Sequence, residues 1–389
     1  MGKRFWFASL LSNIGTWAQQ VAQPWLLISL GASPFLIGLD SFALGAPVWL
    51  LTLLGGTLAD RVDRRRVIGG FQSLQMLCPT LLMVLLLFGR VQPWMVICLS
   101  LVVGITDALS MPSFQSIVPS IVERSQIAHG LALNSTQFNL SRILGPALAG
   151  LLLAGVGAAG CFAVSAASYL PFIGVALWIL PRGRPAPDGA RSVPAWQALR
   201  EAVRLLLTRP TVQGTLLTVF CSSLLCAQLL TFAPVLVKNA FQGGAGHFSM
   251  AVSAFGVGGL LGALLLLVLP AGQDRRRLCS HAALAYGLLL VAAALDPWFW
   301  ALPVLLAAAG TAMGLSNISG NTLIQTGTEV ELRGQAVSLY MLAMRGGLSL
   351  GSLLTGLSVS AFGVRQALLL NGLLAVLAQG AIARRWLRG

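Results

Sequence analysis

Four ionisable residues lie inside long apolar stretches of the sequence: Asp40, Asp107, Arg142 and Arg345. In a lipid bilayer, insertion scales put the cost of Asp or Arg at a helix centre at about 2.5–3.5 kcal/mol, so each needs a partner or a function. A carboxyl group in partly dehydrated surroundings can bind and release a proton in the physiological pH range. Asp40 is therefore the first candidate for proton coupling and Asp107 the second. An Asp40 at the aqueous edge would have no such role.

Arg142 and Arg345 would bring positive charge into the same apolar surroundings. If both line a binding cavity, they favour an anionic ligand, such as a carboxylate or a catecholate, over a cationic one. Arg142 also has a candidate partner in Asp107 on the preceding apolar stretch. Such an ion pair would be either part of a binding site or a structural contact between two helices.

Polar residues at helical spacing form three further groups of candidate ligand contacts. They are Asn13, Thr16, Gln20 and Gln23; Ser100, Gly104 and Asp107; and Gly310, Gly314, Asn317 and Asn321. Residues three or four positions apart share one face of a helix, and a face of amides has little reason to contact lipid. These faces either contact a ligand or form hydrogen bonds with neighbouring helices.

The composition identifies the environment of these residues. Of 389 residues, 56% are hydrophobic and 9% are charged, against roughly 25% charged residues in a soluble domain. The net charge of +14 lies mainly in segments between the apolar stretches, so it does not indicate a nucleic-acid partner. The six cysteines have neither metal-site nor disulfide spacing. We therefore expect a membrane protein without a metal or another cofactor.

Apolar stretches of about 20 residues, the length that crosses a bilayer, predict an all-α membrane protein with twelve transmembrane helices. We expect these helices at residues 5–30, 34–58, 67–88, 93–119, 130–154, 158–180, 211–237, 247–270, 278–295, 298–321, 335–360 and 363–383. With the N-terminus in the cytoplasm, 20 of the 25 Lys and Arg residues fall in cytoplasmic segments. This bias predicts that both termini are cytoplasmic.

The segment 181–210 is the one long break between apolar stretches. It divides the sequence into a six-helix bundle at 1–180, a cytoplasmic linker at 181–210 and a second bundle at 211–389. Trp196, Leu199 and Val203 share one face of a possible short helix, with Arg200 and Arg204 opposite. The linker carries either this amphipathic helix on the membrane surface or only a solvated tether.

Two sets of matching residues indicate an internal repeat. Asp63-Arg64-Arg65-Arg66 recurs as Asp274-Arg275-Arg276-Arg277, an offset of 274 − 63 = 211. At an offset of 206, Glu123, Gly145 and Gly150 correspond to Glu329, Gly351 and Gly356. Both bundles should therefore run in the same direction, as two parallel six-helix repeats.

The segment GGTLADRVDRRR at 55–66 resembles motif A of the major facilitator superfamily. Matching positions are Gly56, Leu58, Ala59, Asp60, Arg61, Arg64 and Arg65. The wider superfamily often has glycine where this sequence has Asp63. The DRxDRR form, together with the segments 15–27, 134–152 and 321–340, is similar to the drug and siderophore exporter subgroup, and the resemblance covers essentially the whole chain.

This resemblance implies a secondary transporter of the bacterial inner membrane that exports a small amphiphilic molecule, a siderophore or a drug, by proton antiport. It implies that helices 1, 4, 7 and 10 line a cavity, which makes their polar residues and the two arginines the candidate substrate contacts. We expect the transporter to be a monomer. A lipid or lysolipid flippase of the same fold is the alternative.

The resemblance also implies a cytoplasmic gate formed by Gly56, Asp60, Arg61, Arg64 and Arg65, in which Asp60 accepts hydrogen bonds from the start of the helix near Arg333. Alternatively, these arginines only set the topology and contact anionic lipid. The sequence has no Walker motif and no nucleophile paired with a base, which argues against ATP hydrolysis and against an enzyme.

Overall fold

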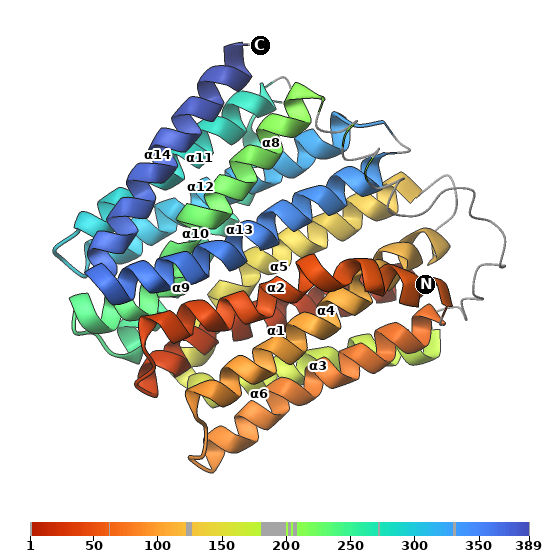
Figure 1. Ribbon diagram of the computed structural model, residues 1–389, viewed down its shortest axis with the longest axis horizontal. Coiled ribbons are helices and arrows are strands. Elements are labelled where there is room, and N and C mark those ends of the chain that lie inside the picture. Colours follow the sequence, from red (N-terminus) through yellow and green to blue (C-terminus); the bar gives the residue numbers. More distant parts are fainter. Residues whose placement is uncertain are drawn as a thin grey trace. The chain divides into compact units, whose positions relative to one another are not determined.

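The computed structural model describes residues 2–61, 63–121, 127–179, 200, 204, 208–270, 273–329 and 332–388. These residues form α-helices and short π-helical turns, without any strand. In the first half of the chain the helices are α1 (Gly2–Ser29), α2 (Pro34–Arg61), α3 (Arg64–Leu87), α4 (Pro93–Ile121), α5 (Ile127–Gly155) and α6 (Gly157–Gly174), which continues into the π-helical turn η2 (Val175–Ile179). Figure 1 shows their arrangement.

The second half begins with one long helical segment made of α8 (Pro210–Cys221), η3 (Ser222–Cys226), α9 (Gln228–Val235) and η4 (Leu236–Ala240). It is followed by α10 (Ala245–Val268), α11 (Arg275–Leu295), α12 (Ala301–Thr326), α13 (Arg333–Phe362) and α14 (Val364–Arg388). Every predicted span coincides with a helix or with one such continuous segment. The prediction of twelve helical segments is therefore confirmed for the described part of the chain.

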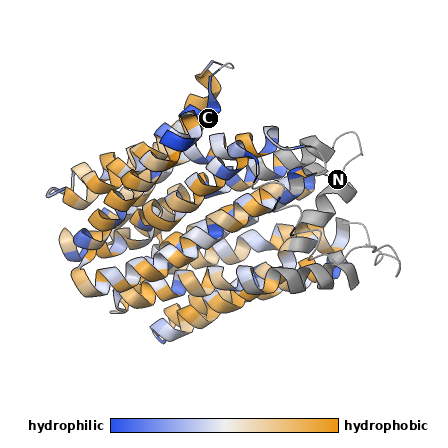
Figure 2. Cartoon of the chain, turned by 45° about the horizontal axis from the view of Figure 1, so that its top comes forward, coloured by the Kyte–Doolittle hydropathy of each residue, from blue (hydrophilic) through white to orange (hydrophobic). Residues whose placement is uncertain are grey.

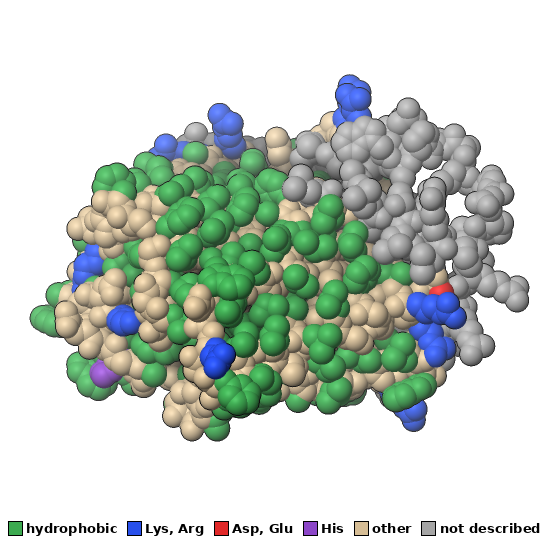
Figure 3. Space-filling view, turned by 60° about the horizontal axis from the view of Figure 1, so that its bottom comes forward, with side chains coloured by type: hydrophobic (Ala, Val, Ile, Leu, Met, Phe, Trp, Pro, Cys, Tyr) green, Lys and Arg blue, Asp and Glu red, His purple; other side chains and the backbone are tan. Residues whose placement is uncertain are grey.

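Ten of these helical segments are long and apolar enough to cross a membrane, and Pro34–Trp49 is a shorter apolar helix. Figure 2 shows that hydrophobic residues predominate along the helices, and hydrophobic side chains cover much of the face drawn in Figure 3. The helix α1 is not among the ten, because its asparagine and glutamine side chains lower its hydropathy. The cytoplasmic position of the termini stays a prediction.

The chain forms two compact units, one of residues 1–32 and 39–190 and one of residues 33–38 and 191–389. In the first unit α1 packs against α5 and α6, and α3 against α4 and α6. In the second, α12 packs between α10 and α11, and α14 lies against α11 and α13. Most of the linker at 181–210, including the expected amphipathic helix, lies outside the described residues.

Glycines set the closest approaches between helices in both units. A β-carbon added at Gly104 of α4 would lie 2.4 Å from the carbonyl oxygen of Leu44 on α2. A β-carbon at Gly310 of α12 would lie 2.1 Å from the carbonyl oxygen of Phe255 on α10. The two glycines differ by 206 positions and the two carbonyl residues by 211, which are the offsets of the predicted repeat. The repeat is therefore visible in the packing as well as in the sequence.

A second pair of glycines follows the same rule. A β-carbon added at Gly145 of α5 would lie 3.2 Å from the backbone nitrogen of Ala18 on α1. A β-carbon added at Gly351 of α13 would lie 2.0 Å from the carbonyl oxygen of Leu224 in η3. Ala18 and Leu224 are again 206 positions apart. Helices associate in lipid through such close packing at small residues, because burial of apolar surface offers little driving force there.

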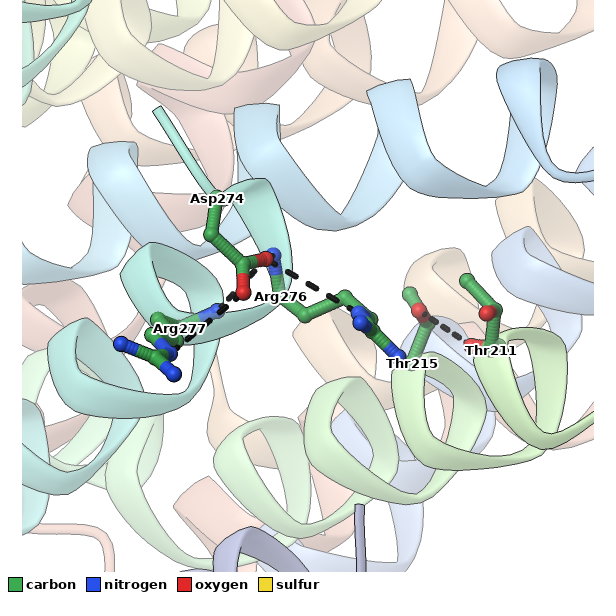
Figure 4. Close-up of polar contacts among 5 residues, drawn as sticks. All are labelled: Thr211, Thr215, Asp274, Arg276 and Arg277. Carbon is green, nitrogen blue, oxygen red and sulfur yellow. Dashed lines mark hydrogen bonds and ion pairs between the residues drawn. The ribbon is translucent and has the colours of Figure 1, made fainter. Parts of the chain in front are cut away.

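The repeated Asp-Arg-Arg-Arg segments begin equivalent helices. The Oδ1 atom of Asp63 accepts the backbone N–H of Arg65 at 3.0 Å at the start of α3. The Oδ1 atom of Asp274 accepts the N–H groups of Arg276 and Arg277 at 2.9 and 3.5 Å at the start of α11, as Figure 4 shows. The aspartates stabilise the helix ends as N-caps. Arginines are unfavourable beside the positive end of a helix dipole, but in α11 the side chains of Arg276 and Arg277 also pair with Asp274, with nitrogen–oxygen distances of 3.8 and 3.5 Å.

Buried glutamines donate hydrogen bonds to backbone carbonyl groups in and next to the π-helical turn η3 of the second unit. Gln228 Nε2 donates to the Ser223 carbonyl oxygen at 3.0 Å, and Gln379 Nε2 donates to the Thr218 carbonyl oxygen at 3.0 Å. A π-helical turn disturbs the regular backbone hydrogen bonds of a helix. In an apolar environment, the two glutamines thus add side-chain donors to backbone carbonyl groups in and next to the turn.

The glycine contacts lead to a direct test. Gly258 of α10 lies so close to α12 that an added β-carbon would be 1.8 Å from the Ala307 carbonyl oxygen, whereas nothing lies within 4 Å of one added at Gly246 of the same helix. We expect Gly258→Ala to destabilise the protein by about 1–3 kcal/mol, as overpacking does. Gly246→Ala should be close to neutral. Thermal unfolding of both variants in detergent would test this expectation, and equal melting temperatures would contradict the described contact.

Candidate functional site

Asp40 is the centre of a buried hydrogen-bond cluster in the first unit. Its side chain on α2 is only 4% exposed. Its Oδ1 atom accepts the hydroxyl of Ser100 on α4 at 2.6 Å, and the Gln23 Nε2 atom of α1 lies 3.4 and 3.3 Å from its two oxygens. Gln23 Nε2 also donates to Ser100 Oγ at 2.7 Å. Two helices, α1 and α4, thus donate hydrogen bonds to one carboxyl group on α2.

The cluster continues along α1 and reaches a fourth helix. Gln19 Nε2 donates to Gln23 Oε1 at 3.2 Å, and the Ser165 hydroxyl of α6 donates to Gln19 Oε1 at 2.7 Å. Gln19, Gln23, Ser100 and Ser165 are all buried, with 7% exposure at most. We call these four residues together with Asp40 the amide chain. It connects α2 and α4 to α6 through the two glutamines of α1.

Two glycine contacts position the ends of the amide chain. Ser100 and Asp40 each lie four residues, about one helical turn, before Gly104 and Leu44, where α4 and α2 touch. At the other end, Gly15 lies one turn before Gln19, and a β-carbon added there would be 2.1 Å from Ser168 Oγ and 3.2 Å from the Ser165 Cα atom. The close approach of the backbones therefore brings the short serine side chains within reach of Asp40 and Gln19.

The arrangement suits a carboxylate that can also accept a proton. A carboxylate only accepts hydrogen bonds, and here a hydroxyl and an amide donate to it. Such hydrogen bonds to a charged group are stronger than neutral ones. Among the described residues, no other charged side chain bonds to the amide chain, so protonation of Asp40 would leave it neutral.

Sequence reasoning missed Gln19, Ser100 as a partner of Asp40, and Ser165. Gln19 had a recognisable signal, because it precedes Gln23 by four residues on the same face of α1. Ser100 precedes Gly104 by the same interval. No sequence signal indicated that Ser100 pairs with Asp40 or that Gln19 pairs with Ser165, since these contacts depend on how four helices are rotated against one another.

The other polar residues of α1 contact neighbouring helices. Asn13 Nδ2 donates to Gln137 Oε1 on α5 at 3.2 Å, and Thr16 Oγ1 lies 3.0 Å from the Tyr169 hydroxyl on α6. Gln20 is half-buried. The polar stripe of α1 is therefore not one surface: Asn13 bonds to α5, Thr16 lies against α6, and Gln23 joins Asp40.

The arginines have different surroundings in the two units. The guanidinium of Arg142 lies over the ring of Trp17 at 5.5 Å, a cation–π contact between α5 and α1. Arg345 on α13 and Asp107 on α4 are half-buried. The expected ion pair between Asp107 and Arg142 stays a prediction.

In the second unit, the predicted stripe on α12 divides between packing and polar contacts. Gly310 and Gly314 face α10, where added β-carbons would lie 2.1 Å from the Phe255 and 3.0 Å from the Gly259 carbonyl oxygens. Asn321 is buried, and its Oδ1 atom accepts Gln325 Nε2 at 2.5 Å. The carbonyl oxygen of Asn317 accepts the Tyr340 hydroxyl at 3.0 Å. Our grouping of the two glycines with ligand-contacting residues is not supported by this packing, and the same holds for Gly104.

The predicted gate falls mostly on residues whose side chains lie outside the described part of the structure: Gly56, Asp60, Arg61 and Arg64. Arg65 is described and is half-buried. Among the described residues, no group of three or more His, Cys, Asp or Glu side chains could hold a metal ion.

Several known proteins resemble this chain along nearly its whole length. It is 23% identical to the staphyloferrin A transporter of Staphylococcus aureus, covering 96% of this chain and 93% of that protein. It is 27% identical to the multidrug efflux pump Tap of Mycolicibacterium fortuitum, with 93% and 90% covered, and 26% identical to the enterobactin exporter EntS of Salmonella typhimurium, with 97% and 92% covered.

The fold has a solved counterpart as well. A bacterial homologue of the human lysosomal transporter Spinster, in an inward-facing conformation, superposes with a TM-score of 0.67 at 17% identity, covering 100% of this chain and 97% of that one. A family profile described as "Transmembrane secretion effector" matches residues 2–388. With its twelve helices in two repeated units, the chain belongs to this family of the major facilitator superfamily, whose members are multi-pass membrane transporters and not enzymes.

Proposed function

We propose that this protein is a secondary exporter of a small amphiphilic molecule across the bacterial inner membrane, driven by proton antiport. The observation that carries the proposal is Asp40, a buried carboxyl held by Ser100 and Gln23 within a transporter fold. Burying a carboxyl group within a membrane costs free energy, and such groups mark ion or proton pathways. Alternating access would then couple proton entry at Asp40 to export of the substrate.

The substrate proposed here is anionic, with Arg142 and Arg345 as its charge contacts. Guanidinium groups bind carboxylates and catecholates through charge-assisted hydrogen bonds. Relatives named as transporters of staphyloferrin A and enterobactin support a siderophore as the substrate. The relative named as a multidrug pump leaves other amphiphilic molecules as alternative substrates. Asn13, Thr16, Gln20, Asp107, Asn317 and Asn321 stay candidate contacts of the uncharged parts of the substrate.

The motif A residues are proposed as a cytoplasmic gate, with Asp60 as its central acceptor. Arginines are unfavourable at the start of a helix, and the pairs of Arg276 and Arg277 with Asp274 are partly exposed; their recurrence at the starts of α3 and α11 supports a role at the membrane face. The bundles at 1–180 and 211–389 would act as the two moving bodies of a monomer.

Replacement of Asp40 tests the energy source. In inverted membrane vesicles with an imposed pH gradient, we expect Asp40→Asn to reduce substrate accumulation to the level of vesicles without a gradient. Asparagine keeps the shape and hydrogen-bonding capacity of the side chain but cannot exchange a proton. Exchange of labelled substrate without a gradient should persist, because this step needs no proton.

The matched variant Asp107→Asn separates the two carboxyl candidates. Asp107 is half-buried and lies outside the amide chain, so we expect accumulation in this variant still to depend on the pH gradient, even where loss of a substrate contact lowers its rate. Normal coupling in Asp40→Asn, or loss of coupling only in Asp107→Asn, would refute the assignment of the proton to Asp40. Gradient-independent movement of a lysolipid would favour a flippase instead.

Replacement of the arginines tests the substrate class. We expect Arg142→Gln and Arg345→Gln each to weaken transport of a carboxylate or catecholate siderophore by roughly 10- to 100-fold, the equivalent of one charge-assisted hydrogen bond. Export of a cationic drug should not fall in parallel. Arg90→Gln, which removes an exposed charge, is the control. Unchanged siderophore export in both variants would exclude the arginines as anion contacts.

A further inference from the structure

The amide chain contains two glutamines in series, and this arrangement permits the direction of its hydrogen bonds to reverse. A glutamine amide has a donor end and an acceptor end of nearly equal shape. A half-turn of the amide group about the Cγ–Cδ bond therefore exchanges the positions of donor and acceptor without moving the helix. In a series of such groups, the orientation of one amide constrains the next.

In the described orientation, every bond of the chain points toward the carboxylate. Ser165 donates to Gln19, Gln19 donates to Gln23, and Gln23 donates to Asp40 and Ser100. Ser100 in turn donates to Asp40. This is the pattern that an ionised Asp40 requires, because both of its oxygens can only accept.

When Asp40 carries a proton, the hydrogen-bonding requirement at the Asp40 end of the amide chain is reversed. The protonated carboxyl becomes a donor and needs an acceptor, which Gln23 supplies if its oxygen turns toward Asp40 and Ser100. Gln23 Nε2 then faces Gln19, which must turn its own oxygen to accept. Gln19 Nε2 would next donate to Ser165 Oγ, and the Ser165 hydroxyl can turn to the carbonyl oxygen four residues earlier in α6.

We propose that Gln23, Gln19 and Ser165 form a two-state relay that reports the protonation of Asp40 on α2 to α6. The amides rotate and carry no proton: the single proton added stays on an Asp40 oxygen. Gln23 and Gln19 are thus positioning residues for the proton site. This inference rests on the proposed function, in that it takes Asp40 as the proton carrier.

Burial makes the two states distinct. All five side chains are shielded from solvent, so water cannot replace a missing partner, and an unpaired buried group costs about 1–3 kcal/mol. A state with only one amide reversed would leave two donors or two acceptors facing each other. The two glutamines must therefore reverse together or not at all.

In the part of the chain that the structure describes, no other charged side chain is hydrogen-bonded to the relay. On the same helices the ionisable residues are Lys3 and Arg4 at the start of α1, Asp60 and Arg61 about twenty positions beyond Asp40 on α2, Cys98 and Asp107 on α4, and Cys161 and Tyr169 on α6. Tyr169 is within 3.0 Å of Thr16 Oγ1, and Arg142 of the adjoining α5 lies over Trp17. Asp107 is seven residues from Ser100, about 10 Å along the helix.

Infrared difference spectroscopy between acidic and alkaline pH can test the relay, using the full-length protein in liposomes with isotope-labelled glutamine. We expect a protonated-carboxyl signal that Asp40→Asn removes, accompanied by a glutamine side-chain signal with the same pH midpoint. Gln23→Leu should abolish the glutamine signal, and Gln19→Leu should remove the contribution of Gln19. A purely structural role of these residues would produce no glutamine signal that follows the carboxyl group.

The protein offers a matched control in α3. Gln72 Nε2 donates to Gln75 Oε1 at 3.0 Å, and both side chains are buried, but Gln72 Oε1 and Gln75 Nε2 have no partner that could join the pair to a carboxyl group. Gln75→Leu should leave the pH-dependent glutamine signal unchanged. Loss of the signal in this variant, or its survival in Gln23→Leu, would overturn the relay.

The experiment distinguishes failure of the relay from failure of the proposed proton site. An Asp40 carboxyl signal that titrates without any glutamine change would overturn the relay and leave the proposed proton site intact. In that case Ser100 accepts the new hydrogen bond and turns its own hydroxyl away, while the glutamines keep their orientation. A carboxyl signal that persists in Asp40→Asn would overturn both the relay and the proposed proton site.

Discussion

The contact between Gly104 and the Leu44 carbonyl group is the constraint on which the polar chemistry of this protein depends. Inside a bilayer, helices gain little by burying apolar surface against one another, so small residues and close backbones hold them together. At Gly104 the backbones of α4 and α2 come near enough for a serine hydroxyl to bond a carboxyl group one turn away. A wider spacing would leave Asp40 without its strongest partner.

The same environment explains why amides recur at helix contacts. Without water, each buried polar group needs a partner within the protein. Glutamine can satisfy a donor and an acceptor at once, as Gln23 does beside Asp40 by accepting from Gln19 and donating to Asp40. Gln228 and Gln379 donate to backbone carbonyl oxygens in and next to the π-helical turn η3. A group that completes the packing in this way is also sensitive to any change in the charge of its neighbour.

The two units share packing but not chemistry. Shifted by the offsets of the repeat, Asp40 corresponds to residue 40 + 211 = 251, Ser100 to 100 + 206 = 306 and Gln23 to 23 + 206 = 229. These positions hold Ala251, Leu306 and Leu229, all of them apolar. The glycine contacts are retained in both units while the polar cluster is present in one, so the packing of the helices does not require the polar cluster.

The sequence by itself determined the helices, their number and the repeat, because hydropathy and glycine spacing are local and survive in any arrangement of the helices. It also marked Asp40, since a charge within an apolar run is visible without coordinates. It did not predict which amides face that charge, and it left open whether Gly104, Gly310 and Gly314 contact a ligand or pack against the neighbouring helices α2 and α10, as they do. Only the tertiary structure decided these points, because they depend on the rotation of each helix about its axis, and this is set by close contacts between residues far apart in the chain.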